Sequence, residues 1–242
     1  MAQHAQPPHW STTYRVDTER LVMPLAGATE FRVGDAAVLL DPITVLGLPA
    51  GQPYQMKPVV DSMRTSIVVS ARLGEPLQVT GDTWVLTPPA LWQLRCHWRG
   101  LARGDAAPAA TSVVLRAALA LARPAVRRGH PGMAAVQRAQ RFMAQQLGQT
   151  GEPRWTLHDV ADAACCSPFH LARRFRQHTG LSVHAWRQRL RLAAALQRLE
   201  EGERSLSALA FALGFSSQSH LGAVFQRELG VTPARAKLML AP

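Results

Sequence analysis

An internal repeat in the last third of the chain restricts its fold more than any other feature. The segment TLHDVADAACCSPFHLARRFRQHTGLSV, which starts at Thr156, aligns with SLSALAFALGFSSQSHLGAVFQRELGVTP, which starts at Ser205. Apolar positions coincide at a spacing of 49 residues and, after one inserted serine, of 50, so that Phe175 matches Phe225. Thr156 and Ser205 can cap the first helix of each copy, and Asp159 completes a capping box in the first copy. Each copy is therefore predicted to form a short helix, a tight turn and a second helix.

The second helix of the first copy has clear start and stop signals. Ser167 can cap its amino terminus, Pro168 suits the first helical position, and Gly180 suits the left-handed residue that follows a helix. These signals predict a helix over about 168–178. Another continuous helix is expected over about 184–201, and its ~18 residues would separate the two copies by ~27 Å at 1.5 Å per residue.

The spacing of apolar residues predicts which face of each second helix points outward. Leu171 and Phe175 are four residues apart and share the inner face, as do Leu221 and Phe225 in the second copy. At ~100° per residue, polar side chains occupy most of the opposite arc. The outward arcs are Phe169, His170, Arg173, Arg176 and Gln177 in the first copy and Ser219, His220, Ala223, Gln226 and Arg227 in the second. Such surfaces suit hydrogen bonding to base edges in a DNA groove.

These residues resemble a known family. SPFHLARRFRQHTGLSVHAWRQRLRL and LSALAFALGFSSQSHLGAVFQRELGVTPA are similar to the DNA-binding domain of AraC/XylS regulators, over roughly residues 133–238. The resemblance implies that two recognition helices read two successive major-groove segments, with base contacts from Phe169, Ala172, Arg173, Gln218, Ser219 and Ala223. The sequence departs from the family at Ala223, where an arginine is common, and at Gly222. The full set of expected DNA-binding residues is Phe169, His170, Ala172, Arg173, Arg174, Arg176, Gln177, Ser217, Gln218, Ser219, Ala223 and Arg227.

The distribution of charge favours the same partner. The formal net charge is +11, of which residues 127–242 carry +9 and residues 1–126 carry +2. Six arginines and no acid lie between residues 172 and 191. Arginine binds phosphate and guanine in a bidentate manner, which indicates a polyanion partner. The alternative for these arginines is a solvated basic face, and the alternative for Phe169 is a core position.

The first ~90 residues have a different pattern. Short β-branched runs, AAVLL, ITVLGL, SIVVS and TWVL, alternate with turn residues and predict strands, and helical spacing begins near Leu91. The expected fold is α+β with two domains: a β-rich, cupin-like barrel with helices over 1–126, a linker over 127–132, and an all-α double helix-turn-helix domain over 133–242. The cupin-like barrel is implied by the family resemblance.

The remaining features exclude several classes of function. No catalytic motif is present, Cys96, Cys165 and Cys166 suit neither a disulfide framework nor a zinc site, and packing is the expected role of the adjacent pair. No cofactor, metal or membrane span is expected, and a cytoplasmic location follows.

The expected protein is a regulator of transcription, not an enzyme. We expect a ligand-responsive activator that binds double-stranded promoter DNA as a homodimer, contacts RNA polymerase and takes a small-molecule effector in its amino-terminal domain. The alternatives are a constitutive DNA-binding or interaction protein without an effector, and a fusion with a DNA-repair enzyme, for which Cys96 would be the reactive residue.

Overall fold

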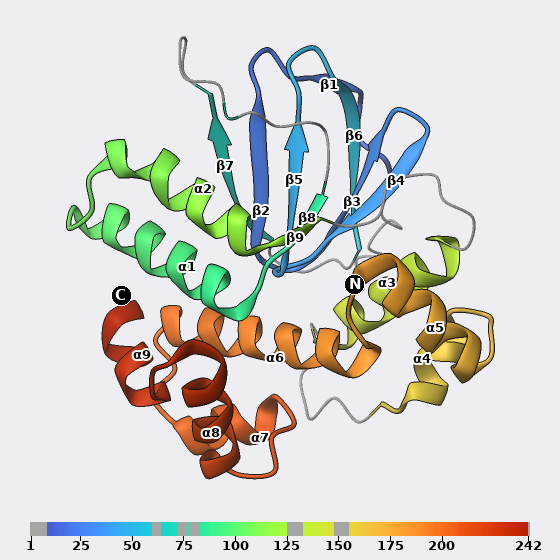
Figure 1. Cartoon of the computed structure of the whole chain (residues 1–242). Helices are drawn as coiled ribbons and strands as arrows, with labels where there is room; N and C mark the ends of the chain where they lie inside the picture. The colour runs from blue at the N-terminus through green and yellow to red at the C-terminus, as the bar shows by residue number, and fades with distance from the viewer. Residues whose placement is uncertain are drawn as a thin grey trace, which may run out of the picture.

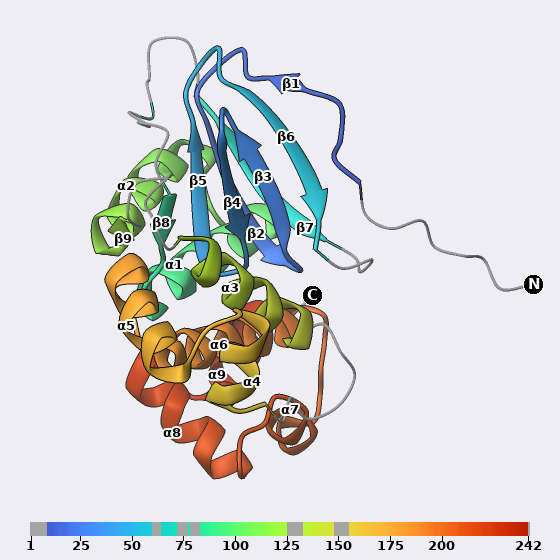
Figure 2. The same ribbon diagram turned by 90° about the vertical axis from the view of Figure 1, so that its right-hand side faces the viewer.

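The amino-terminal part of the chain forms two antiparallel sheets that pack face to face. The computed structural model describes residues 9–59, 64–71, 77, 83–124, 133–147 and 155–241. One sheet has the strand order β1-β6-β3-β4 and the other β7-β2-β5-β8-β9. The strands are β1 (Tyr14–Arg15), β2 (Arg20–Ala26), β3 (Thr29–Val33), β4 (Ala36–Leu40), β5 (Thr44–Leu48), β6 (Pro53–Pro58), β7 (Thr65–Ser70), β8 (Thr83–Val85) and β9 (Arg123–Pro124). Figures 1 and 2 show the two sheets above the helices.

Alternation of apolar residues explains why the sheets pack together. Val22 in β2, Phe31 in β3 and Leu46 in β5 are buried in one cluster between the two sheets. Burial of such side chains contributes ~1.5 to 3 kcal/mol each. The α+β class and the order of strands before helices are confirmed. The described strands form two sheets and not a closed barrel, because β4 pairs only with β3 and β1 pairs only with β6.

The helices cover the other face of the second sheet and continue into the carboxyl-terminal part. They are α1 (Pro88–Arg103), the 3₁₀ turn η1 (Pro108–Ala110), α2 (Thr111–Leu121), α3 (Met133–Leu147), α4 (Leu157–Ala163), α5 (Pro168–Thr179), α6 (Val183–Glu200), α7 (Leu206–Ala212), α8 (Gln218–Leu229) and α9 (Pro233–Leu240). In Figure 1, α6 runs beneath the sheets, with α4 and α5 at one end and α7, α8 and α9 at the other. Helices α5 and α6 agree with the predicted ranges 168–178 and 184–201 to within about one residue at each end.

The sheets and the carboxyl-terminal helices share one hydrophobic core. This core runs from Leu21 and Val45 in the second sheet to Trp186 in α6 and Phe225 in α8. The expected linker, residues 127–132, lies outside the described residues. The division into domains at this linker therefore stays a prediction.

Buried charged side chains also connect the amino-terminal sheets to the helices. Arg95 of α1 is 1% exposed; its Nη1 donates to Oε2 of Glu200 at 2.5 Å and its Nη2 donates to the carbonyl of Leu25 at 2.6 Å. At a separate place, Arg141 of α3 donates to the buried carboxylate of Glu30 in β3. The sheets and the helices are thus connected by hydrogen-bonded charges at two places.

Candidate nucleic-acid interface

The first helix-turn-helix is built by α4 and α5, and its ends follow the predicted caps. Thr156 Oγ1 accepts from the amide of Asp159 at 3.3 Å, and Asp159 Oδ2 accepts from the amide of Thr156 at 2.6 Å. The amide and the hydroxyl of Thr156 both donate to Oδ2 of Asp159, and they hold the pKa of this carboxyl below its usual value. Ser167 caps α5, and Gly180 ends it in the left-handed conformation with φ 71°. Local sequence therefore fixes the length of both helices.

Packing of α5 determines which of its faces is available to a partner. Leu171 and Phe175 are completely buried, and the Phe175 ring meets the Trp186 indole of α6 edge to face at 5.5 Å between centroids. Aromatic pairs of this geometry are favourable beyond the area they bury. Phe169 lies on the opposite side and is 81% exposed, so its alternative role in the core is wrong.

The second helix-turn-helix is built by α7 and α8 in the same way. Ser217 Oγ accepts from the amide of His220 at 3.0 Å, and Gly230 ends α8 with φ 71°. Leu221 and Phe225 are completely buried, at the positions that correspond to Leu171 and Phe175. The predicted duplication is therefore present in three dimensions.

The turns inside the two motifs share a left-handed residue, which the sequence analysis missed. It is Gly214 in the second motif, with φ 74°, and Cys165 in the first, with φ 54°. The two positions are 49 residues apart, the spacing of the repeat, so the alignment itself carried the signal. Cys165 is exposed and Cys166 is half-buried, so packing explains Cys166 better than Cys165.

The predicted DNA-binding residues lie where a partner could reach most of them. Arg173, Arg176, Ser219 and Ala223 are exposed. The other predicted residues that are exposed are Phe169, His170, Ala172, Gln177, Gln218 and Arg227, while Arg174 and Ser217 are half-buried. Each recognition helix thus presents a continuous outward face next to its amino terminus. Whether these side chains contact DNA stays a prediction.

Three of the six arginines between residues 172 and 191 have structural roles instead. Arg187 donates to the carbonyl of Trp155 at 2.9 Å and lies over that indole ring at 4.0 Å. Arg189 donates to the carbonyl of Leu86 at 2.8 Å, and Arg191 is only 9% exposed. The charge that remains on the outside of the first motif is carried by α5. The number of arginines in the sequence could not show which of them are exposed. The arginines of α6 contact the rest of the protein because this helix is buried on several sides.

Two polar residues of α8 are engaged within the protein. Nδ1 of His220 hydrogen-bonds the hydroxyl of Ser216 at 3.0 Å, and its ring meets Phe215 edge to face. Arg227 Nε donates to Glu228 Oε1 at 2.8 Å, in an exposed ion pair. Exposed pairs are weak, so this contact does not prevent Arg227 from binding a phosphate. The face of α8 is nevertheless less basic than that of α5.

The amino-terminal part contacts the end of α9, outside the predicted DNA-binding residues, and the sequence analysis missed this contact. Arg99 of α1 donates two hydrogen bonds to the carbonyl of Ala241, at 2.9 and 2.5 Å, and Arg103 donates to the carbonyl of Met239 at 3.1 Å. These arginines satisfy carbonyl groups at the end of α9, which is the favoured place for a cation. Helix α1 therefore holds the carboxyl-terminal helices in place.

Replacing Gly214 by alanine is expected to destabilise the protein by about 2 to 3 kcal/mol. The left-handed conformation alone costs ~1 to 2 kcal/mol for an L-residue. In addition, the new Cβ would lie 2.5 Å from Nη2 of the buried Arg191, whose guanidinium packs over Phe215. Gly230→Ala is the matched control, because Gly230 has a similar φ of 71° and the Cβ of an alanine there would have no atom within 4 Å. Urea denaturation should show a smaller loss of unfolding free energy for Gly230→Ala. Equal losses for the two variants would show that the Arg191 side chain moves away from the new Cβ without an energetic cost.

Comparison with known proteins agrees with this geometry. Residues 160–237 match a protein family described as a helix-turn-helix domain. A regulator of Streptomyces lividans described as AraC-like is 37% identical over 79 residues, which cover 33% of this chain and 26% of that protein. The transcriptional activator RhaS of Escherichia fergusonii is 36% identical over 74 residues, covering 31% of this chain and 27% of RhaS. The chain thus aligns with less than a third of the length of these relatives.

Among solved structures, ToxT of Vibrio cholerae aligns over 97% of this chain and 96% of its own, with 11% identity and a TM-score of 0.40. A likeness of this size supports no inference about the present protein. The fold, the repeated motif and the family match define residues 160–237 as a helix-turn-helix domain. More narrowly, this domain is similar in sequence to the corresponding part of a regulator described as AraC-like.

Proposed function

We propose that the protein is a sequence-specific DNA-binding regulator of transcription that reads two successive major-groove segments with α5 and α8. The observation that carries this proposal is the pair of recognition helices, each capped at its amino terminus and exposed on one face, at the two ends of α6. Helix α6 has 18 residues and spans ~27 Å, and the motifs at its ends bring the ~34 Å separation of successive grooves within reach. Binding, and not catalysis, is the activity that this arrangement supports.

We propose that each of the two domains predicted from the sequence has a separate role. Residues 133–242 bind promoter DNA, and residues 1–126 bind an effector and form the dimer. A cavity of about 860 Å³ between strands β2 and β7 and helices α1 and α2 supports the effector site, because cavities of ~300 to 1,000 Å³ accept small ligands. Its wall is mixed: Leu21, Ile67 and Leu115 are apolar, whereas Thr111 and Arg116 are polar.

Activation, through contact with RNA polymerase, is the regulatory outcome we propose. No helix in the described segments is both long and apolar enough to cross a membrane. Because the proposed target is promoter DNA, we propose that the protein acts in the cytoplasm. A fusion with a repair enzyme is not favoured, because burial raises the pKa of the Cys96 thiol to about 11 and so suppresses its reactive thiolate.

Replacing Arg173 by alanine is expected to weaken binding to a specific site by ~1 to 3 kcal/mol, which is about 5- to 150-fold, and to relax preference at one base pair. Arg173 is exposed on the outward face of α5 and lies beside Phe169 and Arg176. The site is first found by selecting bound sequences from a random duplex library with the full chain. Binding is then measured by fluorescence anisotropy at a fixed salt concentration.

Arg64→Ala is the matched control for this experiment. Arg64 is an exposed arginine directly before β7, so this variant loses the same charge outside the proposed interface. We expect its affinity to stay within about threefold of wild type, because only long-range electrostatics change. An Arg173→Ala variant that binds like the control would remove α5 from base recognition. A library that yields no enriched sequence would contradict sequence-specific binding altogether.

A further inference from the structure

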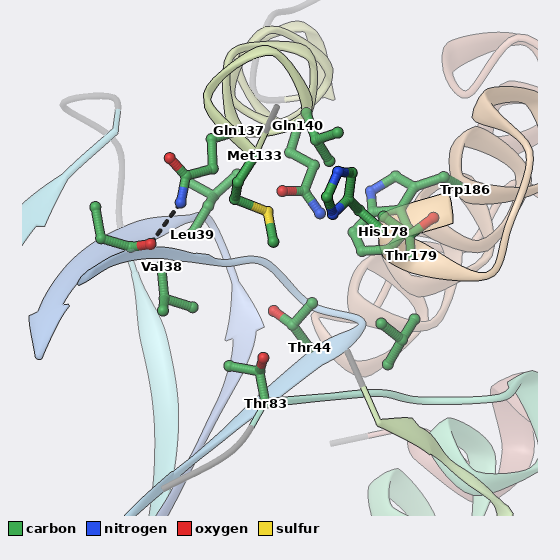
Figure 3. A pocket seen from close by; sticks show the side chains of 13 residues that line it. Val38, Leu39, Thr44, Thr83, Met133, Gln137, Gln140, His178, Thr179 and Trp186 are labelled. Atoms are coloured by element: carbon green, nitrogen blue, oxygen red, sulfur yellow. Dashed lines mark hydrogen bonds between the residues drawn. The ribbon is translucent and has the colours of Figure 1, made fainter. Parts of the chain in front are cut away.

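A second, smaller cavity lies where the sheets meet the first helix-turn-helix. Its volume is about 50 Å³, which is room for roughly three or four water molecules or a ligand of similar bulk. One wall belongs to strands β4, β5 and β8, and the other belongs to helices α3, α5 and α6. Figure 3 shows Thr44 and Thr83 on the sheet side, opposite Gln140, His178 and Trp186 on the helix side. The cavity therefore spans the junction between the proposed effector-binding and DNA-binding parts.

Several polar groups in this cavity already have partners. Thr44 Oγ1 donates to the carbonyl of Asp41 at 3.0 Å and accepts from its amide at 2.7 Å. Thr179 Oγ1 donates to the carbonyl of Phe175 at 2.7 Å and accepts from the amide of Leu181 at 3.1 Å. Such groups shape the wall but have little capacity left for a ligand.

Three other groups are left with hydrogen-bonding capacity. Nε1 of Trp186 is buried and has no partner within hydrogen-bond distance in the part of the chain that the structure describes. The Trp186 indole faces the Asp41 carboxyl and lowers its pKa, but Nε1 and Oδ2 of Asp41 do not meet the geometry of a full hydrogen bond. Thr83 is 9% exposed, and the Gln140 amide is turned toward the cavity. A buried donor without a partner costs ~1 to 3 kcal/mol, so a molecule that accepts from Trp186 would be favoured at this place.

The chemistry of the wall specifies the class of ligand. The described lining residues include no lysine, arginine, aspartate or glutamate; His178 is the titratable residue on the wall, and Met133, Val85 and Val136 are among its apolar residues. A cation would lose its hydration without gaining a counter-ion, and an anion would find at most the imidazole of His178. A group that carries an N–H beside a carbonyl can accept from Trp186 and also serve Gln140, which both donates and accepts. The indole and the small volume favour a planar molecule.

We propose that this cavity binds a small, uncharged, planar molecule with an amide or cyclic urea group, which bridges the sheets and the first helix-turn-helix. Because its wall includes the last turn of α5, occupancy restricts how that recognition helix moves relative to the sheets. This regulatory consequence rests on the function proposed above, whereas binding in the cavity does not.

The test uses the full chain and 2-imidazolidinone, a cyclic urea of six non-hydrogen atoms, as the probe. Ligand-observed NMR should show saturable binding with a dissociation constant of about 1 mM or lower, in the range that ligands of this size reach. Acetate, which is similar in size but anionic, should bind at least tenfold more weakly. Gln140→Met and Thr83→Val keep the volume of each side chain and remove its hydrogen-bonding groups. Each should weaken binding of the probe about fivefold or more.

Gln197→Met is the matched control, because Gln197 lies on α6 outside the cavity and its amide bonds the exposed Glu201. It should bind the probe like wild type. Circular dichroism of each variant confirms that the fold is kept. Absence of saturable binding at 10-fold the expected constant, or binding that survives both cavity variants, would show that the cavity holds water only and overturn the proposal.

Measurements of DNA binding with and without the probe distinguish this proposal from the proposed function. Saturating probe should change the affinity of the wild-type chain for its selected duplex by about threefold or more and leave Gln140→Met unaffected. A chain that binds the probe but no duplex supports the cavity assignment and contradicts the proposed function. A chain that binds the duplex but not the probe supports the proposed function and contradicts the cavity assignment.

Discussion

Replacing Arg95 by methionine is expected to lower the free energy of unfolding by about 3 to 5 kcal/mol. Methionine fills a similar volume, so the loss reflects charge and hydrogen bonding more than packing. Glu200 would remain largely buried without its cation, and the carbonyl of Leu25 would lose its donor. Removing one partner of a buried ion pair usually costs this much. Since a whole domain is stable by only ~5 to 15 kcal/mol, the variant would keep a fraction of its stability.

The measurement is urea denaturation at pH 7, followed by tryptophan fluorescence and circular dichroism. Arg227→Met is the control, because it breaks the exposed Arg227–Glu228 pair and should cost no more than ~1 kcal/mol. Adding Glu200→Gln to Arg95→Met should restore part of the loss, because a neutral amide is cheaper to bury than an unpaired carboxylate. If Arg95→Met lowers the free energy of unfolding no more than the control does, the Arg95–Glu200 ion pair does not hold the sheets and the helices together.

The carboxyl-terminal fold was predictable because its signals are local. Each helix from α4 to α9 begins at a serine or threonine, and the recognition helices end at a glycine, so neighbouring residues alone determine these boundaries. Ser182 caps α6 through the amide of Ala185, and Ser205 caps α7 through the amide of Ala208. The repeat then supplied a second, independent indication of the same boundaries.

The amino-terminal sheets were only partly predictable because their pairing is not local. Strands β4, β5, β7 and β8 were expected from their β-branched runs, whereas β1, β2, β3, β6 and β9 were missed. Strand β2 contains Pro24, and its register shifts near that residue. Strand β5 pairs with residues 20–22 of β2, so Pro24 lies beyond that ladder and its missing N–H breaks no bond on this side. Sequence alone does not show which partner a strand will have.

Contacts between the two parts were beyond sequence reasoning for a related reason. Arg95 and Glu200 are 105 residues apart, and Arg99 and Ala241 are 142 apart. In the sequence, Arg95 is one more positive charge on an amphipathic helix. Only the fold shows that it lies inside the core, while Arg173 and Arg176 remain available on the surface. The position of a charge, and not its number, determines whether it supports the fold or a partner.

Asp41 is expected to make the stability of the protein fall as the pH rises from about 4 to about 7. Its carboxyl lies directly after β4 and is completely buried. Burial raises its pKa from 3.8 to about 7, while hydrogen bonds from Ile43 and Thr44 and the nearby Trp186 indole oppose the rise. The native state therefore holds a proton that the unfolded state releases between these two values. Stability from this group is complete below about pH 4 and is lost as the pH rises through 7.

The expected size is a few kcal/mol, since each pKa unit corresponds to ~1.4 kcal/mol. Asp41→Asn should remove this dependence, because an amide oxygen can still accept from the amide of Ile43 and carries no charge at any pH. The difference in unfolding free energy between variant and wild type, measured in urea from about pH 4 to about pH 8, should therefore grow in favour of the variant. Asp159→Asn should leave the difference nearly constant over this range, because the pKa of Asp159 is lowered from 3.8 and its contribution is lost only as the pH falls below that value. A constant difference for Asp41→Asn would mean that this carboxyl is charged in the native state throughout, and that the junction beneath the sheets is far more polar than its packing indicates.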